Sequence, residues 1–272
     1  MRIQFTKMHA SGNDFIIIDN REGKVSGDIP DMARRLCRQH FSVGADGMIL
    51  IEKSKAADFA WRFFNSDGSE VEMCGNGSRC AARFAYMKCI GGRRLSFETQ
   101  AGIIRAEVKD SSVKVQLPPP KDYRPEVVVN IGGKDYRAAF INTGVPHVVY
   151  FVDNADKVDV QKLGAETRRH EMFAPAGTNV NFAQVAGNGD ILLRTYERGV
   201  EAETFACGTG ATASALVAGA AGLVKSPVRV KTRGGGELTV YFDRDGSRFS
   251  DVFLEGDAVF VYQGVIEKGA LL

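Results

Sequence analysis

The sequence predicts a mixed α/β (α+β) protein built from two similar, pseudo-symmetric domains. Three observations predict this organisation: short β-like runs recur along the chain, a proline triplet interrupts it, and each half contains one Cys-Gly-x-Gly motif. The length of 272 residues suits one large domain or two of ordinary size. A content of 44% hydrophobic and 25% charged residues is typical of a globular protein with a sizeable core.

The first half is expected to consist mainly of strands. Its β-like runs are β-branched or aromatic and are bounded by Gly, Asn or Asp. They are residues 1–7, 15–18, 48–51 and 59–64, followed by three strands within residues 95–117. Apolar residues at Met32, Ala33, Leu36 and Cys37 follow the spacing of one helix face, so a helix is expected over residues 31–40.

A domain boundary is expected at Pro118-Pro119-Pro120, because proline cannot donate strand hydrogen bonds and a proline run makes a stiff linker. The first domain is assigned residues 1–117 with about 263–272, and the second residues 118–262. In the second half, residues 180–185 and 191–196 flank a Gly-Asn-Gly-Asp hairpin signal. A polar helix is expected over residues 161–171 and strands over residues 228–232, 237–242 and 258–262.

The two halves match most closely around their Cys-Gly-x-Gly motifs. In each half a strand leads through a polar loop to the motif, and a helix-like run follows. The motifs begin at Cys74 and Cys207, which are 207 − 74 = 133 residues apart, close to half the chain. Internal duplication is the economical interpretation, with one cysteine at a helix start in each domain.

A cysteine at a helix start has a chemical use. The first turn of a helix has unpaired N–H groups and a partial positive charge, and glycines let an anion approach them. The same field stabilises the thiolate form of a cysteine, whose thiol has a usual pKa of about 8.5. Two such thiols sharing one proton supply what a two-base racemase needs, a thiolate to remove an α-proton and a thiol to return one. A carboxylate held by the N–H groups would accept charge as the proton leaves.

Other function classes find no support. A net charge of +2 gives no electrostatic case for nucleic acid or an anionic membrane. No apolar run approaches the roughly 20 residues of a membrane helix, and no signal peptide is evident. Five cysteines without disulfide-type spacing favour the cytoplasm, and the lack of a CxxC pair argues against structural zinc. Cys37 and Cys80 lie on apolar helix faces and are expected in the core, and Cys89 also lacks the glycine context.

The chain resembles the diaminopimelate epimerase family. The resemblance is carried, in family order, by residues 7–15, 43–47, 64–70, 73–77, 146–147, 179–182, 196–199 and 203–210. It implies two domains, each a curved, mainly antiparallel sheet around a central helix, with the active site in the cleft between them. It also implies a small-molecule amino-acid substrate, a homodimer, no cofactor and no metal. The activity implied is interconversion of LL- and meso-2,6-diaminopimelate in lysine and cell-wall precursor synthesis.

The resemblance also implies residue roles. Cys74 and Cys207 would be the acid/base pair. The reacting carboxylate would be held by Gly75, Asn76, Gly208 and Thr209, and other polar parts of the substrate by Asn13, Asn65 and Asn179. Glu197 and Arg198 would bind an ammonium and a carboxylate, and His147 and Glu197 would tune the thiol pKa values. Asp14, Asp46 and Asp67 are expected to fix loops rather than to react.

Two departures from the family pattern keep alternatives open. Val145 stands where many members have an asparagine that contacts the substrate, and the loop from Arg198 to Cys207 is one residue longer than usual. Histidine racemases of the same type therefore stay possible. Proline and hydroxyproline enzymes usually carry histidine where this chain has Asn76 and have no use for the Glu197–Arg198 pair. A thiol redox or sensor protein and a non-catalytic carboxylate-binding module are the remaining alternatives.

Overall fold

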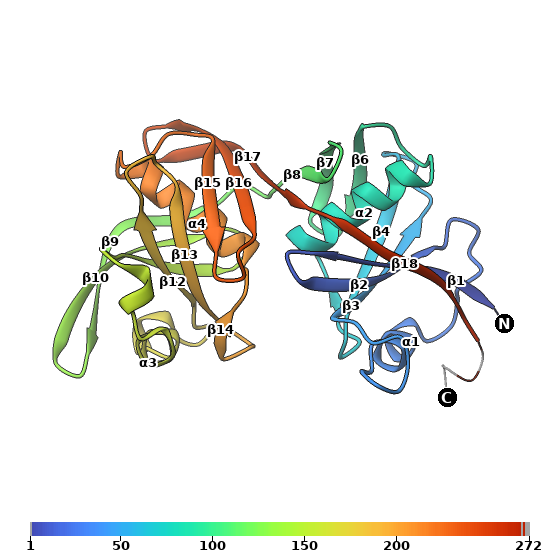
Figure 1. The fold of residues 1–272 in the computed structure, drawn as a ribbon, viewed down its shortest axis with the longest axis horizontal. Coiled ribbons are helices and arrows are strands. Elements are labelled where there is room, and N and C mark those ends of the chain that lie inside the picture. Colours follow the sequence, from blue (N-terminus) through green and yellow to red (C-terminus); the bar gives the residue numbers. More distant parts are fainter. Residues whose placement is uncertain (1, 268, 270–272) are drawn as a thin grey trace. The chain divides into compact units, whose positions relative to one another are not determined.

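The computed structural model describes residues 2–267 and 269, and the chain divides into two compact units (Figure 1). Unit 1 contains the described residues up to Gln116 and those from Gly256 onward, and unit 2 contains Leu117–Glu255. The chain returns to unit 1 at Gly256, earlier than the expected residue 263. The reason is strand β18 (Val259–Ile266), which pairs antiparallel with β1 (Ile3–Ala10) in unit 1.

Unit 1 is a mainly antiparallel sheet. After β18 and β1 its strands follow in the order β2 (Asn13–Asp19), β3 (Gly47–Glu52), β4 (Phe59–Asn65), β6 (Arg94–Thr99), β7 (Gly102–Val108) and β8 (Ser112–Gln116). The pairs β2–β3 and β4–β6 are parallel. A short strand, β5 (Glu70–Val71), forms a hairpin with β4.

Unit 2 repeats this plan strand for strand. Its order is β9 (Lys121–Ile131), β10 (Lys134–Asn142), β11 (Pro146–Phe151), β12 (Asn179–Val185), β13 (Ile191–Glu197), β15 (Val228–Thr232), β16 (Glu237–Asp245) and β17 (Arg248–Asp257). The parallel pairs are again the third and the fifth, β11–β12 and β13–β15, and β14 (Ala202–Thr204) forms the hairpin with β13. The expected pseudo-symmetric pair of mainly antiparallel domains is confirmed. The sequence had not indicated β9, β10, β11 and β17.

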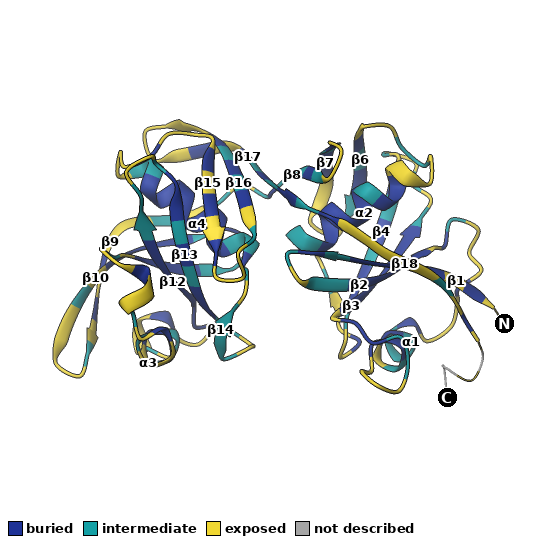
Figure 2. Ribbon diagram, viewed as in Figure 1, coloured by how far each residue is buried: buried dark blue, intermediate teal, exposed yellow. Residues whose placement is uncertain are grey.

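Each sheet curves around one long helix. In unit 1, α2 (Gly75–Met87) contacts β1 near one edge of the sheet and β8 at the other. In unit 2, α4 (Gly208–Ala220) contacts β10 and β16 in the same way. Figure 2 shows α4 almost wholly buried, and residues 210–218 are all classed as buried. Its run of Ala, Gly, Ser and Thr suits a helix enclosed on every side, because small side chains let the strands approach closely.

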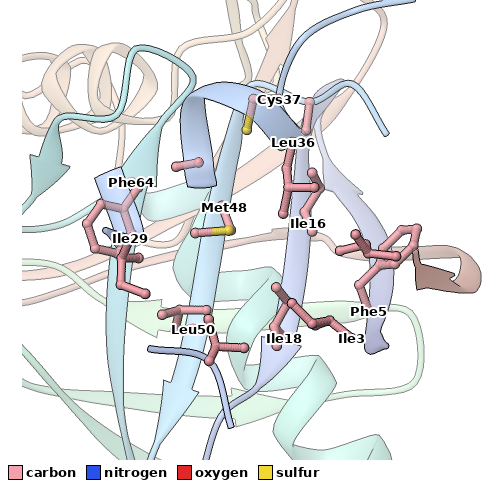
Figure 3. Close-up of a cluster of buried hydrophobic side chains, with 14 residues drawn as sticks. Ile3, Phe5, Ile16, Ile18, Ile29, Leu36, Cys37, Met48, Leu50 and Phe64 are labelled. Carbon is pink, nitrogen blue, oxygen red and sulfur yellow. The ribbon is translucent and has the colours of Figure 1, made fainter. Parts of the chain in front are cut away.

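A shorter helix lies against the other face of each sheet. In unit 1, α1 (Ile29–Leu36) packs onto β3 and β4, and its Ile29 and Leu36 join Ile16 and Met48 in the cluster drawn in Figure 3. Alternate strand residues point to opposite faces, so Ile49 faces α2. Asp28 caps the helix by accepting from the N–H of Asp31 at 2.9 Å. The helix ends at Leu36, short of the expected residue 40, and Cys37 caps it.

In unit 2 the equivalent helix is α3 (Val160–Arg168), which packs on β12 and β13. The helix expected over residues 161–171 is therefore present but ends at Arg168. A separate 3₁₀ turn, Glu171–Phe173, follows it. Cys37 and Cys80 are buried, as expected, and Cys89 is exposed. Within residues 2–267 and 269, no helix has the length and apolar content needed to cross a membrane.

Candidate functional site

Both motif cysteines are the N-caps of the enclosed helices. Cys74 precedes α2, is half-buried, and its sulfur accepts a hydrogen bond from the Gly77 N–H at 3.4 Å. Cys207 precedes α4, is buried, and its sulfur lies 3.5 Å from the Thr209 hydroxyl oxygen. The sequence prediction that each repeat places a cysteine at a helix start is confirmed. Each sulfur therefore lies beside the N–H groups that a helix leaves unpaired in its first turn.

The last glycine of each motif packs closely against the sheet, tightly at Gly77 and without room for a Cβ at Gly210. A Cβ at Gly77 would come within 3.3 Å of side-chain atoms of Ile49 and Trp61. A Cβ at Gly210 would come within 2.4 Å of Asn181 Oδ1 and 3.3 Å of the Cys207 sulfur. These glycines therefore let the helix start sit directly on the sheet, in addition to leaving the N–H groups open.

Asparagines surround Cys74 in unit 1. Asn13 Oδ1 accepts from Asn76 Nδ2 at 3.3 Å and lies 4.0 Å from the Cys74 sulfur. Asn13 Nδ2 donates to Asp46 at 2.6 Å. The structure thus brings three residues singled out from the sequence, Cys74, Asn13 and Asn76, into one cluster. Asn65 lies at the end of β4, and its amide donates to Ser69 Oγ at 3.0 Å, which holds the β4–β5 turn.

The aspartates of this region fix loops, as the sequence suggested. Asp14 and Asp46 accept each other's backbone N–H groups at 2.9 and 3.1 Å, respectively, which ties β2 to the approach of β3. Lys7 forms an ion pair with Asp14 at 2.7 Å and also donates to the Gly44 carbonyl. Asp67 accepts from the N–H and the hydroxyl of Ser69.

In unit 2, Asn179 is a brace between two loops. Its Nδ2 donates to the Pro146 carbonyl at 3.1 Å, and its Oδ1 accepts from the Arg198 N–H at 2.8 Å. The Arg198 guanidinium donates to the Ala176 carbonyl at 3.0 Å. Among residues 2–267 and 269, Arg198 forms no ion pair, which is compatible with the expectation that it binds a substrate carboxylate. Most of its donor groups are left for a ligand.

The one-residue extension of the loop after Arg198 is accommodated in a hairpin. The turn between the paired residues Tyr196 and Glu203 holds six residues, and the equivalent turn between Phe64 and Glu70 holds five. Glu201 adopts φ 59°, and its carboxylate accepts from the Gly199 N–H at 3.1 Å. Val145 lies in the β10–β11 turn, where its carbonyl accepts from the Thr143 N–H at 3.1 Å.

The two repeats differ beneath their helix starts. Strand register makes Phe15, Ile49 and Phe63 in unit 1 equivalent to His147, Asn181 and Thr195 in unit 2. The first trio is apolar. The second is polar and buried: Asn181 contacts His147 Nδ1 at 3.1 Å, and Thr195 donates to Asn181 Oδ1 at 3.0 Å. Asn65 and Glu197, the last residues of β4 and β13, are also equivalent.

Burial dominates the electrostatics of the unit 2 site. Burial, followed by the charge of Glu197, raises the pKa of Cys207 to about 12. Burial also raises the pKa of Glu197. Removal from water therefore outweighs the hydrogen bonds from the Thr209 hydroxyl and from the Thr209 and Gly210 N–H groups, which lower the pKa of Cys207. With its pKa raised to about 12, Cys207 is a neutral thiol at neutral pH.

His147 is also neutral. Burial, with a smaller contribution from Arg198, lowers its pKa to about 3. The resemblance implies that His147 tunes a thiol pKa, and as a neutral imidazole it would do so through hydrogen bonding rather than through charge. Its Nε2 is buried and has no hydrogen-bond partner in the described part of the chain.

Three residues beside the cysteines were not singled out from the sequence. Asn181 and Thr195 lie in strands whose neighbours are apolar, and polar residues inside such strands are a usable signal. Arg79 lies in α2 and is fully buried, which one arginine in a helix-like run does not reveal. As for metals, the described residues contain no group of three or more His, Cys, Asp or Glu side chains that could hold an ion.

Comparison with known proteins is consistent with this duplicated site. The sequence model of the diaminopimelate epimerase family matches residues 5–121 and 139–261. A diaminopimelate epimerase of Aquifex aeolicus (strain VF5) is 49% identical, covering 99% of each chain. That of Hydrogenobaculum sp. (strain Y04AAS1) is 48% identical over 96% of this chain and 97% of the relative.

Solved structures of lower identity share the fold. A Bacillus anthracis phenazine biosynthesis protein of the PhzF family has a TM-score of 0.73 at 17% identity, covering 98% of this chain and 99% of that one. A probable proline racemase from Agrobacterium radiobacter K84 has a TM-score of 0.72 at 16% identity, covering 98% and 93%. With the family model matched in both repeats and close to half of all residues shared with full-length relatives, the chain belongs to the diaminopimelate epimerase family.

Proposed function

We propose that this chain is a cofactor-independent epimerase that interconverts LL- and meso-2,6-diaminopimelate, with Cys74 and Cys207 acting on opposite faces of one α-carbon. The observation that carries the proposal is the pair of cysteines at equivalent helix starts, in a chain 49% identical over its length to a relative named diaminopimelate epimerase. Duplication gives each repeat the same cysteine motif. Two equivalent cysteines that act from opposite faces of one α-carbon would suit inversion of that carbon.

The proposed reaction removes a proton from the α-carbon of the substrate and returns a proton to it. A cysteine thiolate takes the α-proton, and the electron pair moves into the substrate carboxylate. The opposite thiol then gives its proton to the other face of the carbon, so the two sulfurs exchange protonation states. Cys207, whose pKa is raised to about 12, is suited to be the thiol when the enzyme first meets substrate. Cys74 would then be the base for one isomer, and the roles reverse for the other.

Helix N–H groups would stabilise the transition state. The first turns of α2 and α4 start at Gly75 and Gly208, and each leaves N–H donors without helical partners. A substrate carboxylate accepting from these donors gains negative charge as the proton leaves, and fixed donors aimed at developing charge favour that change. Asn76 and Thr209 would add donors from their side chains. No other acid or base is required for the step.

The remaining polar groups would select the substrate. Diaminopimelate carries an ammonium and a carboxylate at each end, so the end that does not react needs a paired anion and cation. Glu197 and Arg198 supply them, and Arg198 is already positioned by Asn179. Asn13 and Asn65 would contact the polar groups nearest Cys74. Val145 offers only an apolar side chain, so we propose that neighbouring residues replace the contact an asparagine makes there.

The protein is also proposed to be a cytoplasmic homodimer with no nucleic-acid or membrane partner. The near-balanced charge supports the second part, since +2 provides little attraction for polyanions. Light scattering after gel filtration tests the dimer directly, because a single mass of 29.6 kDa would contradict it.

The decisive assay compares substrates. Purified protein is incubated with LL-diaminopimelate, and formation of the meso isomer is followed by chiral chromatography. L-Proline, trans-4-hydroxy-L-proline and L-histidine are assayed in parallel. We expect inversion of diaminopimelate alone. Faster inversion of histidine or proline would replace the substrate assignment and keep the chemistry, and no inversion of any of them would reject the epimerase.

A further inference from the structure

Arg79 is the largest fully buried side chain among the described residues, and it lies in α2 two residues beyond the Cys74-Gly75-Asn76-Gly77 motif. Its Nε donates to the Asp257 carbonyl at 3.0 Å. Its Nη2 donates to the Ser11 hydroxyl at 3.1 Å and to Asn76 Oδ1 at 2.8 Å. Nη1 is buried and has no hydrogen-bond partner among the described residues. A guanidinium is rarely buried without a carboxylate in direct contact, so the position calls for a reason.

The contacts of Arg79 lead to the reactive sulfur. Arginine only donates, so Asn76 must turn its oxygen toward Arg79 and its Nδ2 toward Asn13. At the other end Asp46 only accepts, so Asn13 must turn its Nδ2 toward Asp46 and its oxygen toward Asn76 and Cys74. A cation at one end and a carboxylate at the other therefore fix both amide orientations. Either amide would lose contacts by flipping.

Unit 2 has no such cation. Gly77 and Gly210 are equivalent, so Arg79 corresponds to Thr212. The Thr212 hydroxyl donates to the Gly208 carbonyl within its own helix at 2.9 Å and carries no charge. The carboxyl group near Cys207 is Glu197, whose charge opposes a thiolate. The two cysteine sites thus carry opposite electrostatic bias.

The aspartates that border this hydrogen-bonded cluster have partners of their own. Asp257 accepts from the N–H and the hydroxyl of Ser11, at 2.9 and 3.0 Å. Asp46 is bound to Asn13 and to the Asp14 N–H, and Asp14 is paired with Lys7. Cys80 on α2 is fully buried, and burial raises its pKa, so it stays neutral. The buried positive charge on this face of the helix start is that of Arg79.

We propose that Arg79 is a positioning residue for the Cys74 site, where it fixes the Asn76 and Asn13 amides and supplies the buried positive charge that makes Cys74 the thiolate of the pair before substrate binds. The inference rests on the proposed function in one respect only, which is that the Cys74 thiolate serves as the base that removes the α-proton. The contacts that carry it lie within unit 1. It distinguishes the two cysteines, which the repeated motif alone leaves alike.

The test is the pH dependence of Cys74 alkylation by iodoacetamide, read by peptide mass spectrometry on the full-length, ligand-free protein. Exposed Cys89 provides an internal reference rate in the same molecule. We expect Arg79→Met to raise the pH midpoint for Cys74 by about one unit or more, because the buried positive charge bound to Asn76 is lost. Arg79→Lys keeps the positive charge but loses the forked donors of the guanidinium. The pH midpoint of Cys74 in this variant should therefore stay near wild type, while KM for diaminopimelate rises at least about fivefold.

The matched control is Arg83→Met, which removes an arginine one turn further along α2 and should change neither the midpoint nor KM. A folded Arg79→Met protein with an unshifted Cys74 midpoint would overturn the proposal. If circular dichroism shows that Arg79→Met does not fold, Arg79→Lys decides: a wild-type KM, or a midpoint raised by a full unit, contradicts it. Alkylation needs no turnover, so a failed epimerase assay leaves this result interpretable, and an unshifted midpoint leaves the epimerase assignment untouched.

Discussion

Nδ2 of Asn181 lies 3.1 Å from Nδ1 of His147, and neither side chain is exposed to solvent. Asn181 also donates to the Val148 carbonyl at 2.9 Å, while its Oδ1 accepts from the Thr195 hydroxyl at 3.0 Å. With the amide held this way, Nδ1 of His147 is the acceptor and the proton of the neutral ring resides on Nε2. A polar network thus lies beneath the Cys207 helix start, where the other repeat has only apolar side chains.

The buried neutral His147 makes stability fall in mild acid. Its folded pKa, about 3, is below its unfolded value, so the unfolded chain binds a proton that the folded chain does not. The stabilising contribution is complete above about pH 6.5 and is lost as the pH falls toward 3. Between about pH 7 and pH 5.5, we expect His147 to reduce the free energy of unfolding by about 1 kcal/mol. Urea unfolding at pH 7 and pH 5.5 should show that wild type loses this free energy and that His147→Phe does not. Equal losses in the two proteins would mean that His147 binds a proton in the folded state as readily as in the unfolded state.

Removing the centre of the network should be costly. Asn181→Leu leaves His147 Nδ1, the Val148 carbonyl and the Thr195 hydroxyl without their partner. We expect a loss of about 3 kcal/mol or more in the free energy of unfolding, since each unsatisfied buried group costs about 1–3 kcal/mol. Thr195→Val removes one donor and should cost about 1–2 kcal/mol. Equal losses for the two variants in urea unfolding would show that Asn181 is not the centre.

The charge of Glu197 should hold Cys207 in its thiol form. Burial is the larger cause of the raised pKa, and Glu197 is the next. Glu197→Gln removes the charge and keeps the shape, so the pKa of Cys207 should fall and its alkylation at mildly alkaline pH should speed up relative to Cys89. Glu237→Gln, at an exposed position on β16, is the matched control. An unchanged Cys207 rate in Glu197→Gln would remove Glu197 from the electrostatics of the site.

Either cysteine variant should lose epimerisation. A serine hydroxyl is a much weaker acid than a thiol, so Cys74→Ser and Cys207→Ser should each lower kcat/KM by about a hundredfold or more. Each retains one thiol, and that thiol should still serve one face of the substrate. Cys80→Ser, whose sulfur is buried and raised in pKa, is the comparison for a cysteine outside the proposed chemistry. Wild-type kcat/KM in either motif variant would contradict the assignment of two bases.

Much of the fold could be predicted because the duplication leaves marks in sequence. Hydrophobic periodicity located most of the strands, and the repeated cysteine motif located both enclosed helices. Strands β9, β10, β11 and β17 were missed, as were the short strands β5 and β14. Charged and polar residues are frequent in β9, in the first half of β10 and in β17, whereas apolar β11 follows a turn that the sequence did not indicate. These segments become strands because of the strands they pair with, and the local sequence pattern does not reveal which strands those are.

The cluster around Cys74 could be predicted in part, and the electrostatics of the two cysteines less so. Cys74, Asn13 and Asn76 meet as expected, because their motifs lie at strand and helix ends that the fold brings together. The state of His147 and Cys207 depends on burial, which arises from packing by residues far away in sequence. Arg79 is the clearest case, since its partners Ser11 and Asp257 are 68 and 178 residues away.

The most direct test of the two-base claim is the fate of hydrogen during the first turnovers in D₂O. LL-diaminopimelate is incubated with the enzyme, and both isomers are recovered at low conversion for mass spectrometry and NMR. If one cysteine removes the α-proton and the other returns a solvent-derived one, the meso product carries one deuterium at the inverted carbon and the remaining LL substrate carries almost none. A meso product that retains the original proton, or LL substrate that gains deuterium as fast as meso forms, would show a single base and contradict the mechanism.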